Sequence, residues 1–477
     1  MVSINNFIKK FVNAILEKNA AIFAGAGLSR QSGYVDWRNL LRPLAEEIEL
    51  DIDKEYDLPL VAQFYRNSKT SRNEINQEIL NSFSVDVEAN DNINILTRLP
   101  IKTYWTTNYD SLLEKSFKEN NRCVDVKINQ DHLAIVKKNR DAILYKMHGD
   151  AVYPNDTVLT KDDYEKYEYK RPLFRTALKG DLISKTFLFI GFSFEDPNLN
   201  YILSQINSLI GENKREHYCF FKKIEKDPNE SEEEFQYRKI RQDLREKDLK
   251  RYGIESVILD SYDDIHKILL RIEKSINMNN IFISGSADKF EEPWNTILAN
   301  DFLFRLAKEL VKRDYKIFSG FGKNIGSSVI NGALNEIYSN KYEHIGEYLS
   351  LHPFPQNIDD AEKRKESYSK YRKSILKNVG IVIFVFGNKE INGEIVDAGG
   401  CLEEFNIASN DNKIIIPIGS TGNVAKTILS KLKDNINEYK YLEKYLDILE
   451  NSTDIDGLLK AIIDIINNQI KLLYSIN

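Results

Sequence analysis

The chain has 477 residues, of which 42% are hydrophobic and 29% charged, as expected of a globular protein with two or three domains. Its formal net charge of −6 argues against a nucleic-acid scaffold, and no apolar run reaches the roughly 20 residues that span a bilayer. The three cysteines, Cys123, Cys219 and Cys401, lie too far apart in sequence for a disulfide framework or paired zinc knuckles. We therefore expect three small buried apolar residues, no metal site, no nucleic-acid or membrane partner, and a reducing cytoplasm.

The first half of the chain alternates short strands with longer helices. Residues 1–21 form an amphipathic pattern without the apolar core of a signal peptide, so we expect a first helix there. Six runs rich in β-branched or aromatic residues follow, at 20–25, 101–107, 141–149, 185–193, 216–223 and 255–260. The charge-dense segment 222–253 indicates a solvated surface helix. This alternation is typical of a parallel sheet flanked by helices.

The alternation restarts after the polar sequence NMNN near residue 279. Strands are expected at 280–287, 315–322, 379–388 and 412–420, and an amphipathic helix at 454–477. We therefore place a domain boundary between 1–278 and 279–477. The predicted fold is α/β, with two Rossmann-like domains that are each a mainly parallel sheet flanked by helices.

Polar groups follow four of the predicted strands in the first half, at 25–29, 106–110, 148–150 and 191–194, with Asp196 nearby. Each of these signals alone has a structural alternative. Glycines form tight turns, an Asn-Tyr-Asp segment caps helices, and a lone histidine is often structural. Because the carboxyl ends of parallel strands meet at one edge of a sheet, their joint placement indicates a ligand site there.

These motifs resemble the sirtuin superfamily over roughly residues 1–275. GAGLS is similar to its first NAD-binding loop, TTNYD to its T-x-N-x-D segment, HGD to its histidine-glycine motif, and GFSFEDPNL to the Gly-x-Ser loop of sirtuin-like domains in bacterial defence proteins. In that family NAD⁺ is consumed, because the bond between nicotinamide and ribose breaks. Arg30 stands where the six-residue dinucleotide fingerprint has a third glycine. The four zinc cysteines of the deacetylases are missing, so the resemblance implies NAD⁺ hydrolysis, with water as acceptor.

The resemblance also implies roles for individual residues. His148 would act as general base, Asn108 would hold the water or the ribose hydroxyls, and Asp110 would stabilise the positive charge or position nicotinamide. Backbone amides of Ala24 to Gly27 would take the pyrophosphate. Ser193 is expected either at the adenosine or as a turn hydroxyl. The expected NAD⁺-binding set is Ala24, Gly25, Ala26, Gly27, Ser29, Asp36, Thr107, Asn108, Asp110, Gly191 and Ser193.

Two glycine-rich strand-to-helix turns mark the second half, at 282–287 and 318–332. Arg372 precedes one predicted strand, and a further pair of glycines opens a helix that carries Glu403 and Glu404. Together they favour a nucleotide pocket, although ordinary turns and surface charges are the alternative for any one residue.

This half resembles the SLOG family of nucleotide-sensing domains, and the whole layout resembles the NADase effectors of Thoeris anti-phage defence. In that family a partner with a TIR domain makes a cyclic ADP-ribose isomer, which the SLOG domain binds, and the sirtuin-like domain then depletes NAD⁺. Lys323 stands where the family shows an apolar residue. The resemblance places signal contacts on Gly285, Ser286, Lys323, Phe354, Arg372, Lys389, Gly400 and Glu404.

The resemblance further implies a homo-oligomer, a tetramer or larger, in the bacterial cytoplasm, with NAD⁺ as substrate and no cofactor. Two other functions stay open. One is a non-catalytic regulator that senses NAD⁺, against which the presence of both Asn108 and His148 argues. The other is a protein deacylase or ADP-ribosyltransferase, which the missing zinc cysteines disfavour.

Overall fold

The computed structural model describes residues 2–194, 196–211 and 213–475. The chain divides into two compact units, Met1–Glu273 and Lys274–Asn477. The division falls inside helix α14 (Asp264–Asn277), and the boundary that we placed after residue 278 follows this helix directly. Across the described residues, no helix has the length and apolar character needed to cross a bilayer.

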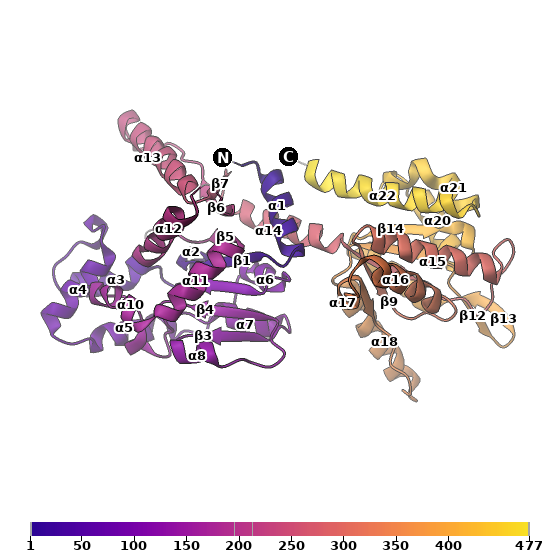
Figure 1. The fold of residues 1–477 in the computed structure, drawn as a ribbon, viewed down its shortest axis with the longest axis horizontal. Helices are drawn as coiled ribbons and strands as arrows, with labels where there is room; N and C mark the ends of the chain where they lie inside the picture. Colours follow the sequence, from indigo (N-terminus) through magenta and orange to yellow (C-terminus); the bar gives the residue numbers. More distant parts are fainter. Residues whose placement is uncertain (1, 195, 212, 476–477) are drawn as a thin grey trace. The chain divides into compact units, whose positions relative to one another are not determined.

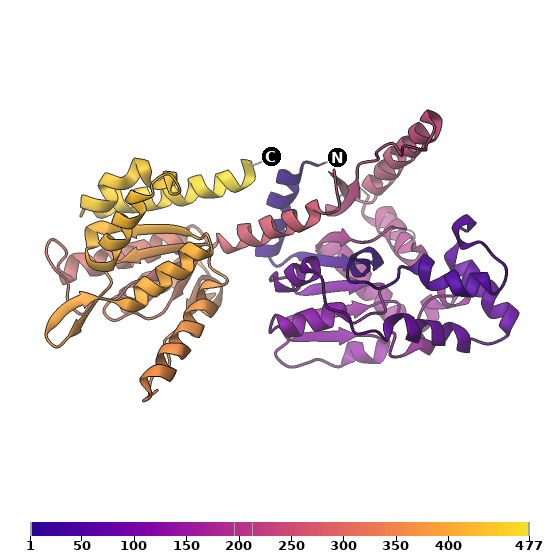
Figure 2. The ribbon, with the colours of Figure 1, turned by 180° about the vertical axis from the view of Figure 1, so that it is seen from behind.

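The first unit is built on a seven-stranded parallel sheet in the order β3-β4-β2-β1-β5-β6-β7. Helices lie on both sides of this sheet (Figures 1 and 2). The strands are β1 (Ala20–Ala24), β2 (Thr103–Thr106), β3 (Val124–Lys127), β4 (Ala142–Lys146), β5 (Thr186–Ile190), β6 (His217–Lys222) and β7 (Ile254–Leu259). All six strands expected from the sequence are confirmed. Strand β3, at the edge of the sheet, was not expected, and in it Asp125 and Lys127 form a buried ion pair of 2.8 Å.

Helix α1 (Ile4–Leu16) is amphipathic as expected, with Phe7, Ile8 and Phe11 buried, although Leu16 is exposed. Helix α13 (Glu232–Arg251) extends away from the sheet (Figure 1), and Leu249 is its buried residue. The other helices of the unit are α2 (Ala26–Arg30), α3 (Trp37–Glu46), α4 (Leu58–Lys69), α5 (Asn73–Phe83), α6 (Asp91–Arg98), α7 (Leu112–Glu119), α8 (Gln130–Ala134), α9 (Lys161–Glu165), α10 (Tyr167–Lys170), α11 (Pro172–Ser184) and α12 (Pro197–Ile210), with short 3₁₀ turns η1 (Ile52–Lys54) and η2 (Pro154–Asp156).

The second unit has a five-stranded parallel sheet in the order β10-β9-β8-β11-β14 and a separate antiparallel hairpin of β12 and β13. Its strands are β8 (Asn280–Ser284), β9 (Lys316–Ser319), β10 (Leu349–Leu351), β11 (Ile381–Val385), β12 (Asn388–Ile391), β13 (Glu394–Asp397) and β14 (Ile414–Ile418). The four strands expected here are confirmed. Strand β10 and the hairpin were missed, although Asn392-Gly393 at the tip of the hairpin is a two-residue turn with positive φ at both positions (54° and 85°), which favours asparagine and glycine.

Both faces of the second sheet are covered by helices, and their buried side chains form one hydrophobic core. Helices α15 and α16 pack against each other and against β9, while α19 and α20 pack against β14. The helices are α15 (Thr296–Lys312), α16 (Gly326–Asn340), α17 (Ile345–Tyr348), α18 (Ala361–Leu376), α19 (Gly399–Asn410), α20 (Asn423–Asp434), α21 (Leu446–Asn451) and α22 (Ile455–Ser475), with 3₁₀ turns η3 (Gly419–Thr421) and η4 (Lys440–Tyr445). The two α/β folds therefore agree with the predicted fold class. Cys219 and Cys401 are buried as expected, whereas Cys123 is only partly buried.

Candidate functional site

A cleft of about 1480 Å³ opens at the carboxyl ends of the strands in the first unit. The chain passes from β1 to β2 on one side and later to β5 on the other, so strand order reverses at β1, where open α/β sheets bind ligands. Most of the predicted site residues line this one cleft: Ala26, Gly27, Ser29, Asp36, Thr107, Asn108, Asp110, His148, Gly191 and Ser193. Ala24 lies in β1 and Gly25 just after it, and neither belongs to the lining.

Three glycines bring the ends of β1 and β5 into backbone contact. The Gly25 N–H donates to the Ile190 carbonyl at 2.9 Å, and the Gly27 N–H donates to the Gly191 carbonyl at 2.9 Å. A Cβ at Gly25 would collide with the Gly191 carbonyl oxygen, and Gly191 itself has a φ of +65°. The N–H groups of Gly25 and Gly27 are thus paired within the protein, and the role of the amides from Ala24 to Gly27 at a pyrophosphate stays a prediction.

The Asn108 side chain is held by hydrogen bonds that its amide nitrogen donates, whereas its amide oxygen has no hydrogen-bond partner among the described residues. Its Nδ2 donates to the Gly25 carbonyl at 3.1 Å and to Ser29 Oγ at 2.9 Å. Its Oδ1 is buried and has no hydrogen-bond partner among the described residues. A buried acceptor without a donor lowers the stability of the fold by about 1–3 kcal/mol. We therefore expect Oδ1 to accept a hydrogen bond from a water or a ribose hydroxyl.

His148 follows β4 and is 4% exposed. Its Nε2 lies 3.0 Å from Oδ2 of Asp196, close in distance but not aligned as a hydrogen bond. The Tyr164 hydroxyl donates to the same carboxylate oxygen at 3.1 Å. Burial alone would raise the pKa of Asp196, but the His148 imidazole, the Leu199 N–H and the Tyr164 hydroxyl together lower it, which favours an ionised carboxylate.

A buried lysine holds the loop that carries Asn108 and Asp110. Lys146, at the end of β4, is fully buried and donates to the carbonyls of Tyr109 at 3.2 Å and Asp110 at 2.6 Å. It also pairs with Glu114 at 3.1 Å and with Asp150. Burial opposes its charge, yet these carboxylates hold the pKa of the lysine above its usual value. Lys146 was not among the predicted site residues, because a lysine inside a strand run carries no signal of burial.

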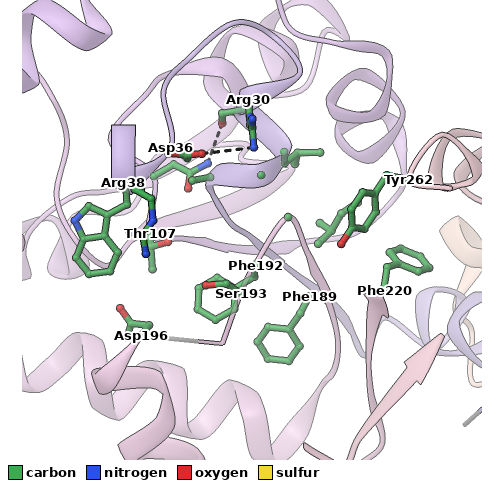
Figure 3. A pocket seen from close by; sticks show the side chains of 18 of the residues that line it. Arg30, Asp36, Arg38, Thr107, Phe189, Phe192, Ser193, Asp196, Phe220 and Tyr262 are labelled. Carbon is green, nitrogen blue, oxygen red and sulfur yellow. Dashed lines mark hydrogen bonds and ion pairs between the residues drawn. The ribbon is translucent and has the colours of Figure 1, made fainter. Parts of the chain in front are cut away.

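The two ends of the cleft differ in character (Figure 3). Thr107, Arg38 and Asp196 lie toward one end, and Phe220 and Tyr262 toward the other. Asp36 caps α3 through the Asn39 N–H at 2.9 Å and forms an ion pair with Arg30 at 3.6 Å. The neighbouring Trp37 has a buried Nε1 without a hydrogen-bond partner among the described residues.

Cationic side chains also line the cleft. They are Lys222 of β6 and, together with Gln242, three arginines of α13: Arg238, Arg241 and Arg245. Arg238 also pairs with Glu230, and Lys222 with Glu225. The Arg245 guanidinium donates to the Ser193 carbonyl, which ties α13 to the loop after β5. Most of α13 is solvated, as expected from its charge density, but no local pattern indicates that part of this helix borders the cleft.

In the second unit, the structure brings part of the predicted signal-binding set together around Arg372. Its guanidinium donates to Glu403 at 2.7 Å, lies 3.4 Å from Glu404, and stands 4.9 Å from the Phe354 ring centroid. A Cβ at Gly400 would stand 2.5 Å from the guanidinium. Burial raises the pKa of Glu404, which accepts from the Ser284 hydroxyl at 2.6 Å. Ser284 precedes Gly285, so this cluster adjoins the first glycine turn.

The remaining predicted signal contacts lie around Asn388, a buried residue that was not among the predicted contacts. The Ser286 hydroxyl donates to the Asn388 carbonyl at 3.0 Å. The Asp288 N–H donates to Asn388 Oδ1 at 2.8 Å, and the Asp288 side chain pairs with Lys323 at 2.5 Å. Lys389 is exposed and follows Asn388 in β12. Lys323 therefore has a carboxylate partner, Asp288, within the chain.

Comparison with known proteins agrees with both units. Residues 102–242 match the SIR2-like domain family, a match that begins after the Gly25–Ser29 loop, and residues 264–469 match the Sir2- and TIR-associating SLOG family. A Bacillus cereus (strain MSX-D12) protein named NAD(+) hydrolase ThsA is 46% identical over 467 residues, which cover 96% of this chain and 97% of that protein. A protein of the same name from Enterococcus faecium is 42% identical over 474 residues, 97% of this chain and 98% of its own. Defense-associated sirtuin 2 of Bacillus subtilis is 27% identical over 236 residues, 47% of this chain and 23% of its own.

Proposed function

The chain belongs to the family of the NAD(+) hydrolases named ThsA, and from this premise we propose that it is a signal-activated NAD⁺ hydrolase of bacterial anti-phage defence. One observation carries the catalytic part of the proposal. The buried Oδ1 of Asn108 has no partner among the described residues, and it lies in a cleft at the strand reversal that His148 and Asp110 also line. This arrangement suits a ligand that brings hydroxyl groups or water to Asn108.

The proposed reaction converts NAD⁺ and water into ADP-ribose, nicotinamide and a proton. Nicotinamide is a cationic leaving group, and its departure builds positive charge on the ribose. Asn108 accepts a hydrogen bond from the attacking water or a ribose hydroxyl, and His148 takes the proton that is released. Asp110, held through the Leu112 N–H at 3.0 Å, stabilises the positive charge or positions nicotinamide. NAD⁺ is thus the substrate, and we propose no cofactor.

The second unit is proposed to bind the signal, a cyclic ADP-ribose isomer made by a partner with a TIR domain. The Arg372 guanidinium, which stands over the Phe354 and Tyr368 rings, suits an anionic pyrophosphate joined to a nucleobase. An NADase that is always active would deplete its own host cell. The signal must therefore bind the active state more tightly than the resting state, and we propose that a homo-oligomer, a tetramer or larger, couples the two sites.

The test is to incubate the purified chain with NAD⁺, with and without cyclic ADP-ribose isomers, and to measure nicotinamide and ADP-ribose. We expect equal amounts of both products and a higher rate with one isomer. Absence of nicotinamide under every condition would favour a non-catalytic sensor instead. Nicotinamide released only when an acylated peptide is present would favour a deacylase.

A further inference from the structure

We propose that Asp196 positions His148 for the reaction, so that the two residues form a buried carboxylate–imidazole pair. This inference rests on the proposed NAD⁺ hydrolysis and adds a residue to its machinery. The Asp196 side chain reaches the cleft from the loop between β5 and α12, whereas His148 comes from the end of β4. The fold therefore brings together two groups that are 48 positions apart in sequence.

The two oxygens of the Asp196 carboxylate have different partners. Oδ1 accepts the Leu199 N–H at 2.8 Å and caps α12. Oδ2 lies 3.0 Å from His148 Nε2 and accepts the Tyr164 hydroxyl at 3.1 Å. Oδ1 thus anchors Asp196 to the backbone, and Oδ2 faces the imidazole. The hydrogen bond from Tyr164 helps to hold Oδ2 in this orientation.

Helix capping alone does not explain a buried charge at this position. Neutral side chains cap other helices of the same chain, such as Asn90 at α6 and Asn295 at α15. The Asp196 and His148 side chains are both 5% exposed. A carboxylate at such depth is costly unless it is paired, and the imidazole is a partner that can carry the compensating charge. A neutral side chain would be enough to cap α12, and the contact with His148 explains why an aspartate stands at this position.

The pairing also assigns the proton transfers. Because Asp196 faces Nε2, a neutral His148 with its proton on Nε2 has its lone pair on Nδ1. The C1′–N bond of NAD⁺ breaks with its electron pair remaining on nicotinamide, and the water oxygen bonds to C1′. The water proton passes to Nδ1 and later to solvent, and Asp196 stabilises the imidazolium in between. The Nε2 contact is at hydrogen-bond distance but is not aligned, and catalytic contacts of this kind tighten when substrate binds.

The ring of Tyr164 connects this pair to the wall of the cleft. It stands edge-on to the imidazole, with centroids 5.5 Å apart and planes at 84°, and it stacks on Trp37 at 6.1 Å. Tyr164 is thus in contact with both members of the pair, with its hydroxyl on Asp196 and its ring beside His148. A change at Tyr164 is therefore expected to disturb the alignment of the pair while leaving the cap of α12 in place.

The experiment compares Asp196→Asn with wild type and with Asp57→Asn under the condition in which wild type is active. Asparagine keeps the capping oxygen and the size but removes the charge. We expect kcat to fall about 100-fold, within the range of general acid–base effects. The KM for NAD⁺ and the affinity for ADP-ribose should change little. Asp57 caps α4 through the Leu60 N–H at 3.1 Å and lies outside the pair, so Asp57→Asn should keep the wild-type kcat.

Two outcomes overturn the inference while leaving NAD⁺ hydrolysis standing. The first is a kcat for Asp196→Asn within twofold of an active wild type. The second is a further loss greater than twofold when Asp196→Asn is added to His148→Ala, since a residue that acts through His148 has no effect without it. An inactive wild type under every condition would instead overturn the proposed function. If Asp196→Asn is unstable, Tyr164→Phe decides: kcat should fall about fivefold at constant KM, and an unchanged kcat contradicts the pairing.

Discussion

Replacing Gly25 by alanine tests whether the ends of β1 and β5 pack as the structure describes. Gly25 has φ −112° and ψ 176°, an extended conformation open to any residue, so the cost of the change is steric. The new Cβ would collide with the Gly191 carbonyl oxygen and lie 2.8 Å from the Phe192 Cα, and neither backbone atom can move like a flexible side chain. Overpacking of this kind costs about 1–3 kcal/mol, and a weakened hydrogen bond to Ile190 adds about 1 kcal/mol.

We therefore expect Gly25→Ala to lose about 2–4 kcal/mol, which for a unit of this size lowers the melting temperature by about 4–16 °C. NAD⁺ hydrolysis should fall as well, because Asn108 Nδ2 is anchored on the Gly25 carbonyl. The assay is thermal unfolding followed by circular dichroism, with nicotinamide release measured on the same samples. Gly180→Ala in α11 is the matched control: a Cβ there meets no atom within 4 Å, so it should stabilise by about 0.5–1 kcal/mol. A Gly25→Ala variant as stable and active as wild type would refute the packing.

Three further predictions concern charged side chains that form ion pairs within the protein. Lys146→Met should cost about 3–5 kcal/mol in urea unfolding, because Glu114 and Asp150 lose their cation; a loss under 1 kcal/mol would contradict the buried network. Arg372→Ala should abolish activation by a cyclic ADP-ribose isomer in the nicotinamide assay while NAD⁺ binding stays intact, and full activation would exclude Arg372 from the signal site. Burial raises the pKa of Asp163, but Arg72 and the backbone and hydroxyl donors around the carboxylate lower this pKa overall. His148 and the other hydrogen-bond donors around Asp196 likewise lower the pKa of that residue. On acidification, both carboxylates therefore take up protons in the unfolded chain before they do so in the folded protein. The stability from both residues, present above about pH 4, should be lost as the pH falls further, and Asp163→Asn should flatten that loss in melting curves measured against pH.

The fold was largely predictable because its strands are apolar runs with clear ends. All ten strands that we expected are present, whereas β3, the three-residue β10 and the hairpin of β12 and β13 were missed. β3 reads Val-Asp-Val-Lys, and its two charges are buried only because they pair with each other and with Arg140. Burial of paired charges is a tertiary effect that no local pattern reveals. The Asn392-Gly393 hairpin, by contrast, carried a recognisable turn signal.

The candidate site was predictable in its residues but not in its contacts. Strand ends alone predicted that Asn108, His148 and Gly191 would meet, and they line one cleft. The sequence could not show that the Gly25 and Gly27 amides are taken by the end of β5, since that depends on which strands are neighbours. For the same reason Asp196, visible beside the GFSF motif, gave no sign of its contact with His148.

The most direct test of the central claim is nicotinamide release from NAD⁺ by wild type and by Asn108→Ala, each with and without the activating cyclic ADP-ribose isomer. Alanine removes the unpartnered Oδ1 and the two hydrogen bonds that Nδ2 donates. We predict that wild type releases nicotinamide and ADP-ribose in equal amounts, and that Asn108→Ala, folded by circular dichroism, releases neither above background. Release at the wild-type rate by Asn108→Ala would show that the chemistry does not depend on this residue, and would contradict the account.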